Sequence, residues 1–579
     1  MRNVIIAGAV VAAGAVGYIL TQQDGGITAT SKSPLAYVPA DTVFFSGQLE
    51  PFPLKNYLQS TSSLQAKAPQ ELLDALDDET DPKKRFFTSI IKAYFDAAGS
   101  PAEFQKTFGL PDELRMYVYA VGFIPVIRYE VTDAQGLWAA LDKAEQDSGF
   151  KHELRSSGDL QYRAYTLENN EKGEKFEVLV AFEDGWATWT INTHVNDANT
   201  IDIALAQAEP AKSLQQAGTV EQIATQHGFV KNYISYIDHQ QLVTAFTTEN
   251  GNTLASMLTQ AMTASGDPDG LADVRNPECQ SEIAAIAANW PRTVIGARSA
   301  DDIQITPERS FMRVSTVIES KNKVVMDALA SLQGYIPSYL NDAQVFGLGV
   351  GLDANKLGTG LSSIWSNMLE PTYKCAPLAE MQAGVQQANP AALAMFTGMA
   401  QGVKGIGAAI QDFSLKTEGF APELESLQGI VSLSADNPKV LFDMAKSFAP
   451  PLAAIQLPED GSAIDLSTMV PMPPEVNVKP MLALKGQHLV IFAGERGQAL
   501  ADTLGSEQIS GNGLLNFSMD YKKMLTPLLP VMEMAADPEL TEQMETLKNM
   551  DMKVKLALNL QSQGIELNTE MDIKAPSQK

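Results

Sequence analysis

The sequence is poor in the residues on which many catalytic and metal sites depend. It has two cysteines and five histidines among 579 residues. Two cysteines are too few for a thiolate-rich zinc scaffold or a small disulfide-stabilised domain. The histidines show no H-x-x-x-H or H-E-x-x-H spacing, and no G-x-S-x-G, P-loop or Rossmann glycine pattern occurs. We therefore predict no catalytic, cofactor-binding or metal-binding residue, and a protein that is not an enzyme.

Basic residues are also scarce. Lysine and arginine number 42 against 69 acidic residues, which gives a formal net charge of −27. This balance argues against nucleic acid as a partner, because such binding rests on neutralising phosphates. The hydrophobic fraction, 45%, is ordinary for a globular protein. The length favours more than one domain, since single cores stop growing at roughly 250–300 residues.

One uncharged apolar run stands at the N-terminus, over residues 4–20. Seventeen helical residues span roughly 25 Å, close to the thickness of a thin bilayer core. Arg2 precedes the run, so the positive-inside rule places the rest of the chain outside the cytoplasm. We predict an inner-membrane anchor in residues 1–22, a linker in 23–35 and a periplasmic body. The alternative is a cleaved signal peptide and a secreted or periplasmic protein, with Ala15 and Gly17 as the small residues before the cut.

The body of the chain reads as two copies of one module. AYVPADTVFFSG near the start resembles SYLNDAQVFGLG, and Tyr37 and Tyr339 occupy matching positions at an offset of 302. The same offset relates VAFEDGWATWTI to LALKGQHLVIFA further along the chain. We therefore predict tandem homologous modules at 36–320 and 321–575, followed by a short tail at 576–579.

Each predicted module mixes strands and helices. Apolar and polar residues alternate around Asp184-Gly185 and Gly158-Asp159, which is typical of β-hairpins. Aspartates also stand where strands pass into helices, as helix N-caps do; they are Asp133, Asp238, Asp436 and Asp520. Hairpins mixed with helices predict an α+β fold, with a mixed or antiparallel sheet and packed helices in each module.

The two cysteines, Cys279 and Cys375, lie in different predicted modules. Two lone cysteines in an exported protein usually pair, so we predict a disulfide that joins the modules. The alternative is a pair of buried free thiols.

Two apolar regions are candidates for a binding surface. Residues 390–410 carry one charge and favour an apolar helix, and the C-terminal third is rich in methionine, which adapts to varied partners. Core packing is the alternative for both regions. The candidate apolar binding face comprises Met395, Phe396, Met399, Val403, Ile406, Met524 and Met532.

The segment Pro39 to Gly47, PADTVFFSG, follows soon after the N-terminal apolar run. Together with the Asp133 and Asp436 junctions, it resembles the opening of bacterial envelope proteins of the DUF3352 group. That resemblance implies an exported α+β protein without an assigned activity. The sequence as a whole favours a non-enzymatic binding or scaffold protein of the bacterial envelope, with the inner membrane and an envelope protein or lipid as partners. An envelope hydrolase with a carboxylate site and a purely structural surface protein are the alternatives.

Overall fold

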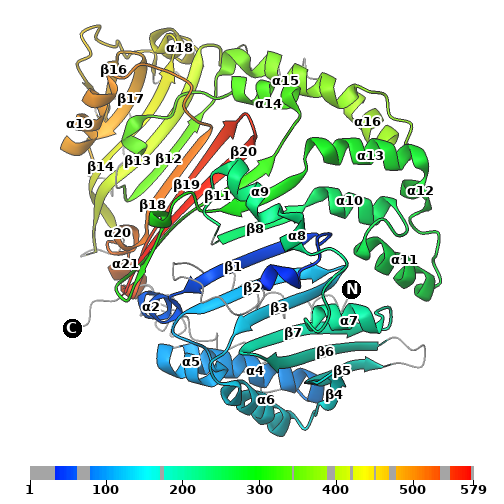
Figure 1. The fold of residues 1–579 in the computed structure, drawn as a ribbon. Helices are drawn as coiled ribbons and strands as arrows, with labels where there is room; N and C mark the ends of the chain where they lie inside the picture. The colour runs from blue at the N-terminus through cyan, green and yellow to red at the C-terminus, as the bar shows by residue number, and fades with distance from the viewer. Residues whose placement is uncertain are drawn as a thin grey trace. The chain divides into compact units, whose positions relative to one another are not determined.

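The computed structural model describes most of the chain (Figure 1). The described residues are 33–61, 79–98, 100–169, 175–231, 233–341, 344–387, 398, 400–417, 422–448, 452–467, 478–534 and 548–575. They divide into two compact units. Unit 1 comprises Met1–Glu319, Lys374–Pro377 and Ile573–Lys579, and unit 2 comprises Ser320–Tyr373 and Leu378–Asp572. Each unit combines sheet and helices, so the predicted α+β class is confirmed.

Unit 1 contains an antiparallel sheet. Its spatial order is β11–β9–β8–β1–β2–β3–β7–β6–β5–β4. Strand β9 pairs with residues 315–318 of β11, and β10 pairs with residues 309–312. The strands are β1 (Phe44–Phe52), β2 (Leu114–Val121), β3 (Ile124–Glu130), β4 (Glu153–Ser157), β5 (Leu160–Asn169), β6 (Lys175–Glu183), β7 (Trp186–Thr193), β8 (Tyr233–Asp238), β9 (Arg292–Gly296), β10 (Ile303–Thr306) and β11 (Arg309–Glu319).

Helices of unit 1 pack on this sheet around one large apolar core. That core includes Phe86, Leu137, Tyr165 and Val178, so it joins two helices to strands β5 and β6. The helical elements are η1 (Pro34–Ala36), α2 (Leu54–Ser60), α4 (Pro82–Ala98), α5 (Pro101–Phe108), α6 (Ala134–Ser148), α7 (Ala198–Ala204), α8 (Leu214–Ala217), α9 (Thr219–His227), α10 (His239–Thr247), α11 (Thr253–Ser265), α12 (Ala272–Arg275), α13 (Pro277–Asn289) and η3 (Ala300–Asp302).

Unit 2 also contains an antiparallel sheet. Its spatial order is β20–β19–β18–β12–β13–β14–β17–β16–β15. The strands are β12 (Phe346–Gly351), β13 (Val403–Lys416), β14 (Glu423–Ala435), β15 (Ile464–Asp465), β16 (Met481–Lys485), β17 (His488–Ala493), β18 (Leu515–Asp520), β19 (Asp551–Gln561) and β20 (Gly564–Lys574). The helical elements are α14 (Lys323–Ser331), η4 (Ser338–Asn341), α15 (Ala354–Leu369), α16 (Ala376–Gln387), α18 (Pro438–Ala445), α19 (Gly494–Leu504), α20 (Tyr521–Leu525) and α21 (Leu529–Met534).

The predicted turn and cap positions explain several of these boundaries. Asp184 and Gly185 both have positive φ, 50° and 82°, as the tight turn between β6 and β7 requires. Asp133 accepts a hydrogen bond from the backbone N–H of Gln135 at 2.8 Å and begins α6. Asp238 and Asp520 cap α10 and α20 in the same way. Each carboxylate satisfies a backbone donor that the first helical turn leaves unpaired.

Two predictions on unit 2 are wrong. The N-cap of α18 is Asn437, which accepts from the backbone of Val440, because Pro438 begins the helix one residue later than predicted. Asp436 instead accepts from the side chain of Asn355 at 2.8 Å. The predicted apolar helix over residues 390–410 is also wrong where it is described from residue 403 onward, since those residues form β13.

The predicted membrane anchor at residues 4–20 lies outside the described residues. Within the described part of the chain, no helix has both the length and the apolar character needed to cross a bilayer.

Candidate functional site

In strands β12 and β13 of unit 2, small residues lie on one face of the sheet and larger apolar residues lie on the other. In β12, glycines at 347, 349 and 351 alternate with Phe346, Leu348 and Val350. In β13, Gly405, Gly407 and Ala409 are buried, whereas Ile406, Ala408 and Ile410 on the other face are not. Successive side chains of a strand point to opposite faces, so this alternation gives the two faces different chemistry.

The small residues lie beneath the helices of unit 2. A Cβ atom on Gly349 would stand 2.4 Å from Cδ1 of Leu340, and one on Gly407 would stand 2.5 Å from the hydroxyl of Tyr339. A larger residue at either position would have to displace these buried side chains of η4, so glycine favours the close approach of η4 to the sheet. The Tyr339 hydroxyl lies 2.9 Å from Oγ of Ser432 on β14. This covered face belongs to the apolar core of the unit.

The large residues form the opposite face, which we call the apolar sheet face. Strand register aligns them in three rows, of which two cross six strands and one crosses four. In the order β19, β18, β12, β13, β14, β17, the first row is Leu558, Leu515, Val350, Ile406, Leu433 and Leu489; the second is Leu556, Phe517, Leu348, Ala408, Val431 and Ile491; the third, from β19 to β13, is Val554, Met519, Phe346 and Ile410.

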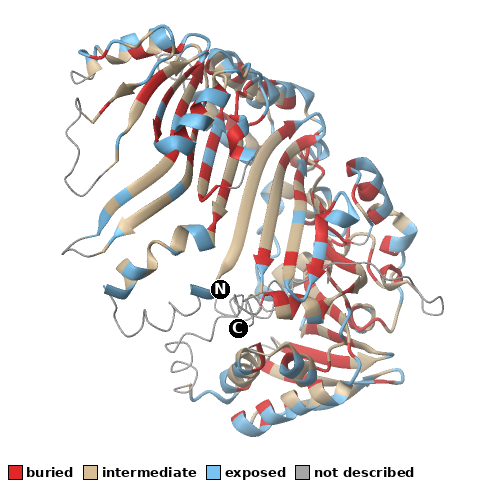
Figure 2. Cartoon of the chain, turned by 90° about the vertical axis from the view of Figure 1, so that its left-hand side faces the viewer, coloured by how far each residue is buried: buried red, intermediate tan, exposed pale blue. Residues whose placement is uncertain are grey.

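None of the side chains of the apolar sheet face is fully buried. Five aliphatic residues near its centre are 38–52% exposed, and the others are half-buried; the five are Leu348, Val350, Ile406, Val431 and Ile491. Figure 2 shows the result as alternating buried and more exposed residues along strands of this unit. Antiparallel sheets normally place apolar residues toward the core and polar residues toward water. Here the face with the more exposed side chains is also apolar, which marks it as a candidate interaction surface.

The predicted binding residues have different positions. Ile406 lies near the centre of the apolar sheet face, and Val403 begins the same strand, β13. Met524 and Met532 are half-buried on α20 and α21. Met395, Phe396 and Met399 lie outside the described residues.

Sequence reasoning missed most of the apolar sheet face, including Leu348, Val431, Ile491 and Phe517. The signal was the alternation itself, in segments such as GLGVG at 347–351 and IVSLSA at 430–435. If glycine and serine are assumed to face water, the large residues of such segments are assigned to the core. In this sheet Leu348, Val350 and Val431 lie on the more exposed face instead.

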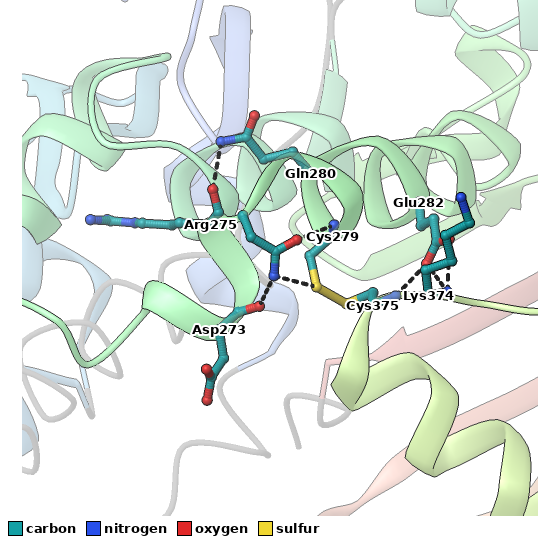
Figure 3. Close-up of a disulfide and its surroundings, with 8 residues drawn as sticks. Asp273, Arg275, Cys279, Gln280, Glu282, Lys374 and Cys375 are labelled. Atoms are coloured by element: carbon teal, nitrogen blue, oxygen red, sulfur yellow. Dashed lines mark hydrogen bonds between the residues drawn. A yellow bond between two sulfur atoms is a disulfide. The ribbon is translucent and has the colours of Figure 1, made fainter.

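The predicted disulfide between Cys279 and Cys375 is present (Figure 3). Cys279 lies in α13, Cys375 immediately precedes α16, and both are buried. The backbone N–H groups of Lys374 and Cys375 donate to the carboxylate of Glu282, at 2.9–3.1 Å. These hydrogen bonds lower the pKa of Glu282. The cysteine-bearing segment Lys374–Pro377, although it lies in the second half of the sequence, belongs to unit 1.

One pair of side chains in unit 2 resembles part of a hydrolytic site. The Ser434 hydroxyl lies 2.8 Å from Nδ1 of His488, and burial lowers the pKa of that histidine. Both residues have 0% exposure, so the hydroxyl has no access to a substrate in this conformation. Among the described residues, no group of three or more histidine, cysteine, aspartate or glutamate side chains could hold a metal ion.

Comparison of the chain with family models, curated proteins and solved structures gives no match. The resemblance to the DUF3352 group therefore stays a prediction.

Proposed function

We propose that this protein is an exported, inner-membrane-anchored, non-enzymatic binding or scaffold protein of the bacterial envelope. The apolar sheet face of unit 2 would hold a neutral, apolar envelope component. The exposed aliphatic side chains of that sheet carry the proposal, because such a surface costs stability in water unless a ligand covers it.

The chemistry of the apolar sheet face limits what it can bind. Its rows contain aliphatic residues, phenylalanine and methionine, and no charged or hydrogen-bonding side chain. A ligand that needs an ion pair or a hydrogen bond finds neither from these side chains. Binding would therefore rest on removing apolar surface from water, at roughly 25 cal/mol per Å².

We also propose that the two units are tandem copies of one module, over residues 36–320 and 321–575. Their strand orders support it: β11–β9–β8–β1–β2–β3–β7–β6–β5 in unit 1 has the same connectivity as β20–β19–β18–β12–β13–β14–β17–β16–β15 in unit 2. Strands β4 and β10 are additional in unit 1. Nine strands in the same order are not expected from unrelated chains.

A matching side-chain contact supports the duplication at the level of residues. In unit 1 the guanidinium of Arg128 lies 5.6 Å from the ring of Tyr37, and in unit 2 the hydroxyl of Tyr339 lies 2.9 Å from Ser432. The two tyrosines match at the offset of 302. Arg128 on β3 and Ser432 on β14 also occupy equivalent places. In each unit, a residue of the first strand (β1 or β12) pairs with a residue of the second strand (β2 or β13), and that residue pairs with Arg128 or Ser432. The two first-strand residues match at the same offset of 302.

The anchor proposal rests on residues 4–20. It predicts that removing this segment changes the compartment in which the protein is found. Full-length protein is expected in the membrane fraction after alkaline carbonate extraction, and a variant that keeps Met1 but lacks residues 2–22 is expected to stay in the cytoplasm. The measurement is fractionation with protease protection of the body in spheroplasts. A mature N-terminus after residue 17 in exported, membrane-free protein would contradict the anchor and support cleavage.

Ile406→Glu tests the binding proposal. A carboxylate at the centre of the apolar sheet face must lose its hydration when a ligand covers it, so we expect at least a tenfold loss of bound apolar component. The measurement is the amount of lipid and protein that co-purifies with the intact chain in mild detergent.

Leu154→Glu is the matched control for Ile406→Glu. Leu154 is also an aliphatic strand residue, 62% exposed against 52% for Ile406, but it lies on β4 of unit 1. The control is expected to retain the wild-type amount of bound component. Equal amounts in the wild type and both variants would overturn the proposed function.

A further inference from the structure

We infer that the occupant of the apolar sheet face is the acyl chain of a lipid whose polar head lies beside the first row, at the ends of strands β12–β14. This inference rests on the proposed function and names the chemical class of its ligand.

The backbone of the apolar sheet face offers no hydrogen bonds. Strands β12, β13, β14, β17 and β18 each pair with a neighbour on both sides, so a peptide cannot join the sheet there as an added strand. An extended polypeptide laid across the face would leave its own N–H and C=O groups without partners. A hydrocarbon chain has no N–H or C=O groups, so it loses no hydrogen bonds when it lies on this face.

The dimensions of the face also favour an acyl chain. Six strands at about 4.8 Å spacing give a width of roughly 24 Å, and three rows give a length of roughly 14 Å along the strands. The area is therefore roughly 300–400 Å². A stable protein interface buries about 800 Å² on each partner, so a second copy of this chain or a globular partner would need more surface. The hydrocarbon of one bilayer leaflet is about 15 Å thick, so an acyl chain of that length matches the face along its strands.

A polar cluster borders the first row and provides a place for the head of the lipid. Lys404 lies 2.9 Å from both carboxylate oxygens of Asp353 and 3.5 Å from Asp436. Lys404 precedes Ile406 by two residues, and the two aspartates follow the row residues Val350 and Leu433 by three. The cluster therefore lies at the end of β12–β14 where the first row lies. One ammonium group faces two carboxylates, so the cluster has no excess positive charge to attract an anionic head, and we expect a neutral or zwitterionic head.

The test uses the full chain in an amphipathic polymer and photoreactive monoacylglycerols with acyl chains of 8, 12 and 16 carbons. Cross-linked peptides are located by mass spectrometry, and the half-saturating concentration is measured for each chain length. We expect label on β12, β13, β14, β17 and β18. We also expect about two- to fourfold tighter binding for each added methylene between 8 and 12 carbons. Ile406→Glu is expected to lose this label, and Leu154→Glu is expected to keep it.

Two outcomes separate failure of this inference from failure of the proposed function. If the wild type takes no more label on these strands than Ile406→Glu, but a co-purified protein is still lost in that variant, the acyl-chain assignment is wrong and the binding function stands. If neither the label nor any co-purified component depends on Ile406, both proposals fall.

Discussion

Replacing both Cys279 and Cys375 with alanine is expected to lower the free energy of unfolding by about 4–5 kcal/mol. The two residues are 96 positions apart in the sequence. In the chain-entropy model, a cross-link that closes a loop of that length removes this much entropy from the unfolded ensemble. The disulfide also holds segment Lys374–Pro377, which belongs to unit 1 although unit 2 residues flank it on both sides.

The measurement is urea unfolding followed by tryptophan fluorescence. Four of the five tryptophans, Trp138, Trp186, Trp189 and Trp290, lie in unit 1, so they report on the unit that carries the cross-link. Wild-type protein kept reduced provides the matched control, because it lacks the cross-link without any change of sequence. It is expected to unfold at the same urea concentration as the double variant. Coincident curves for oxidised and reduced wild type would show that the disulfide contributes nothing.

The sequence predicted those parts of the fold that local chemistry decides. The Asp184-Gly185 turn and the Asp133, Asp238 and Asp520 caps could be read directly, because a turn or cap needs a particular residue at a particular place. The failure at Asp436 has the same origin. Asn437 is an equally good cap and stands directly before Pro438, and proline favours the first position of a helix.

The candidate site could not be read in this way, because it depends on which face of a sheet the helices cover. In β13 the segment GIGAAI has its two isoleucines, Ile406 and Ile410, four residues apart, a spacing that fits one face of a helix as well as one face of a strand. No local pattern, however, states that Gly407 lies under Tyr339 while Ile406 points away from the core. That choice is made by tertiary packing, where a glycine allows one layer to approach another closely.

Glu177→Gln is expected to cost about 3 kcal/mol at pH 7, because it removes the charge at the centre of a buried network. The Glu177 side chain has 0% exposure and lies on β6. Arg155 donates to both of its oxygens at 2.7 and 2.8 Å, and Thr166 and Asn192 each donate at 2.8 Å. The ammonium group of Lys175 lies 2.9 Å away. A glutamine amide cannot replace the negative charge, so Lys175 would lose this carboxylate and Arg155 would keep only the exposed Glu153.

The effect of Glu177→Gln is expected to depend on pH in a defined direction. Burial alone would raise the pKa of Glu177, but the hydrogen bonds from Arg155, Lys175, Thr166 and Asn192 lower it from 4.5 to about 2. A carboxyl group whose pKa is lower in the folded state stabilises that state above its ordinary pKa. This contribution is lost as the pH falls from about 4.5 toward 2. The difference between wild type and Glu177→Gln should therefore shrink toward zero over that range.

Glu153→Gln is the matched control for this experiment. Glu153 also forms an ion pair with Arg155, at 2.5 Å, but its side chain is exposed. An exposed pair is screened by water, so the control is expected to change the free energy of unfolding by less than about 1 kcal/mol. Urea unfolding of the three proteins at pH 7, 4 and 3 measures the effect. A Glu177→Gln deficit that equals the Glu153→Gln deficit, or that stays constant from pH 7 to pH 3, would contradict a charge-stabilised network, since only a buried carboxylate that ionises in this range can produce the expected slope.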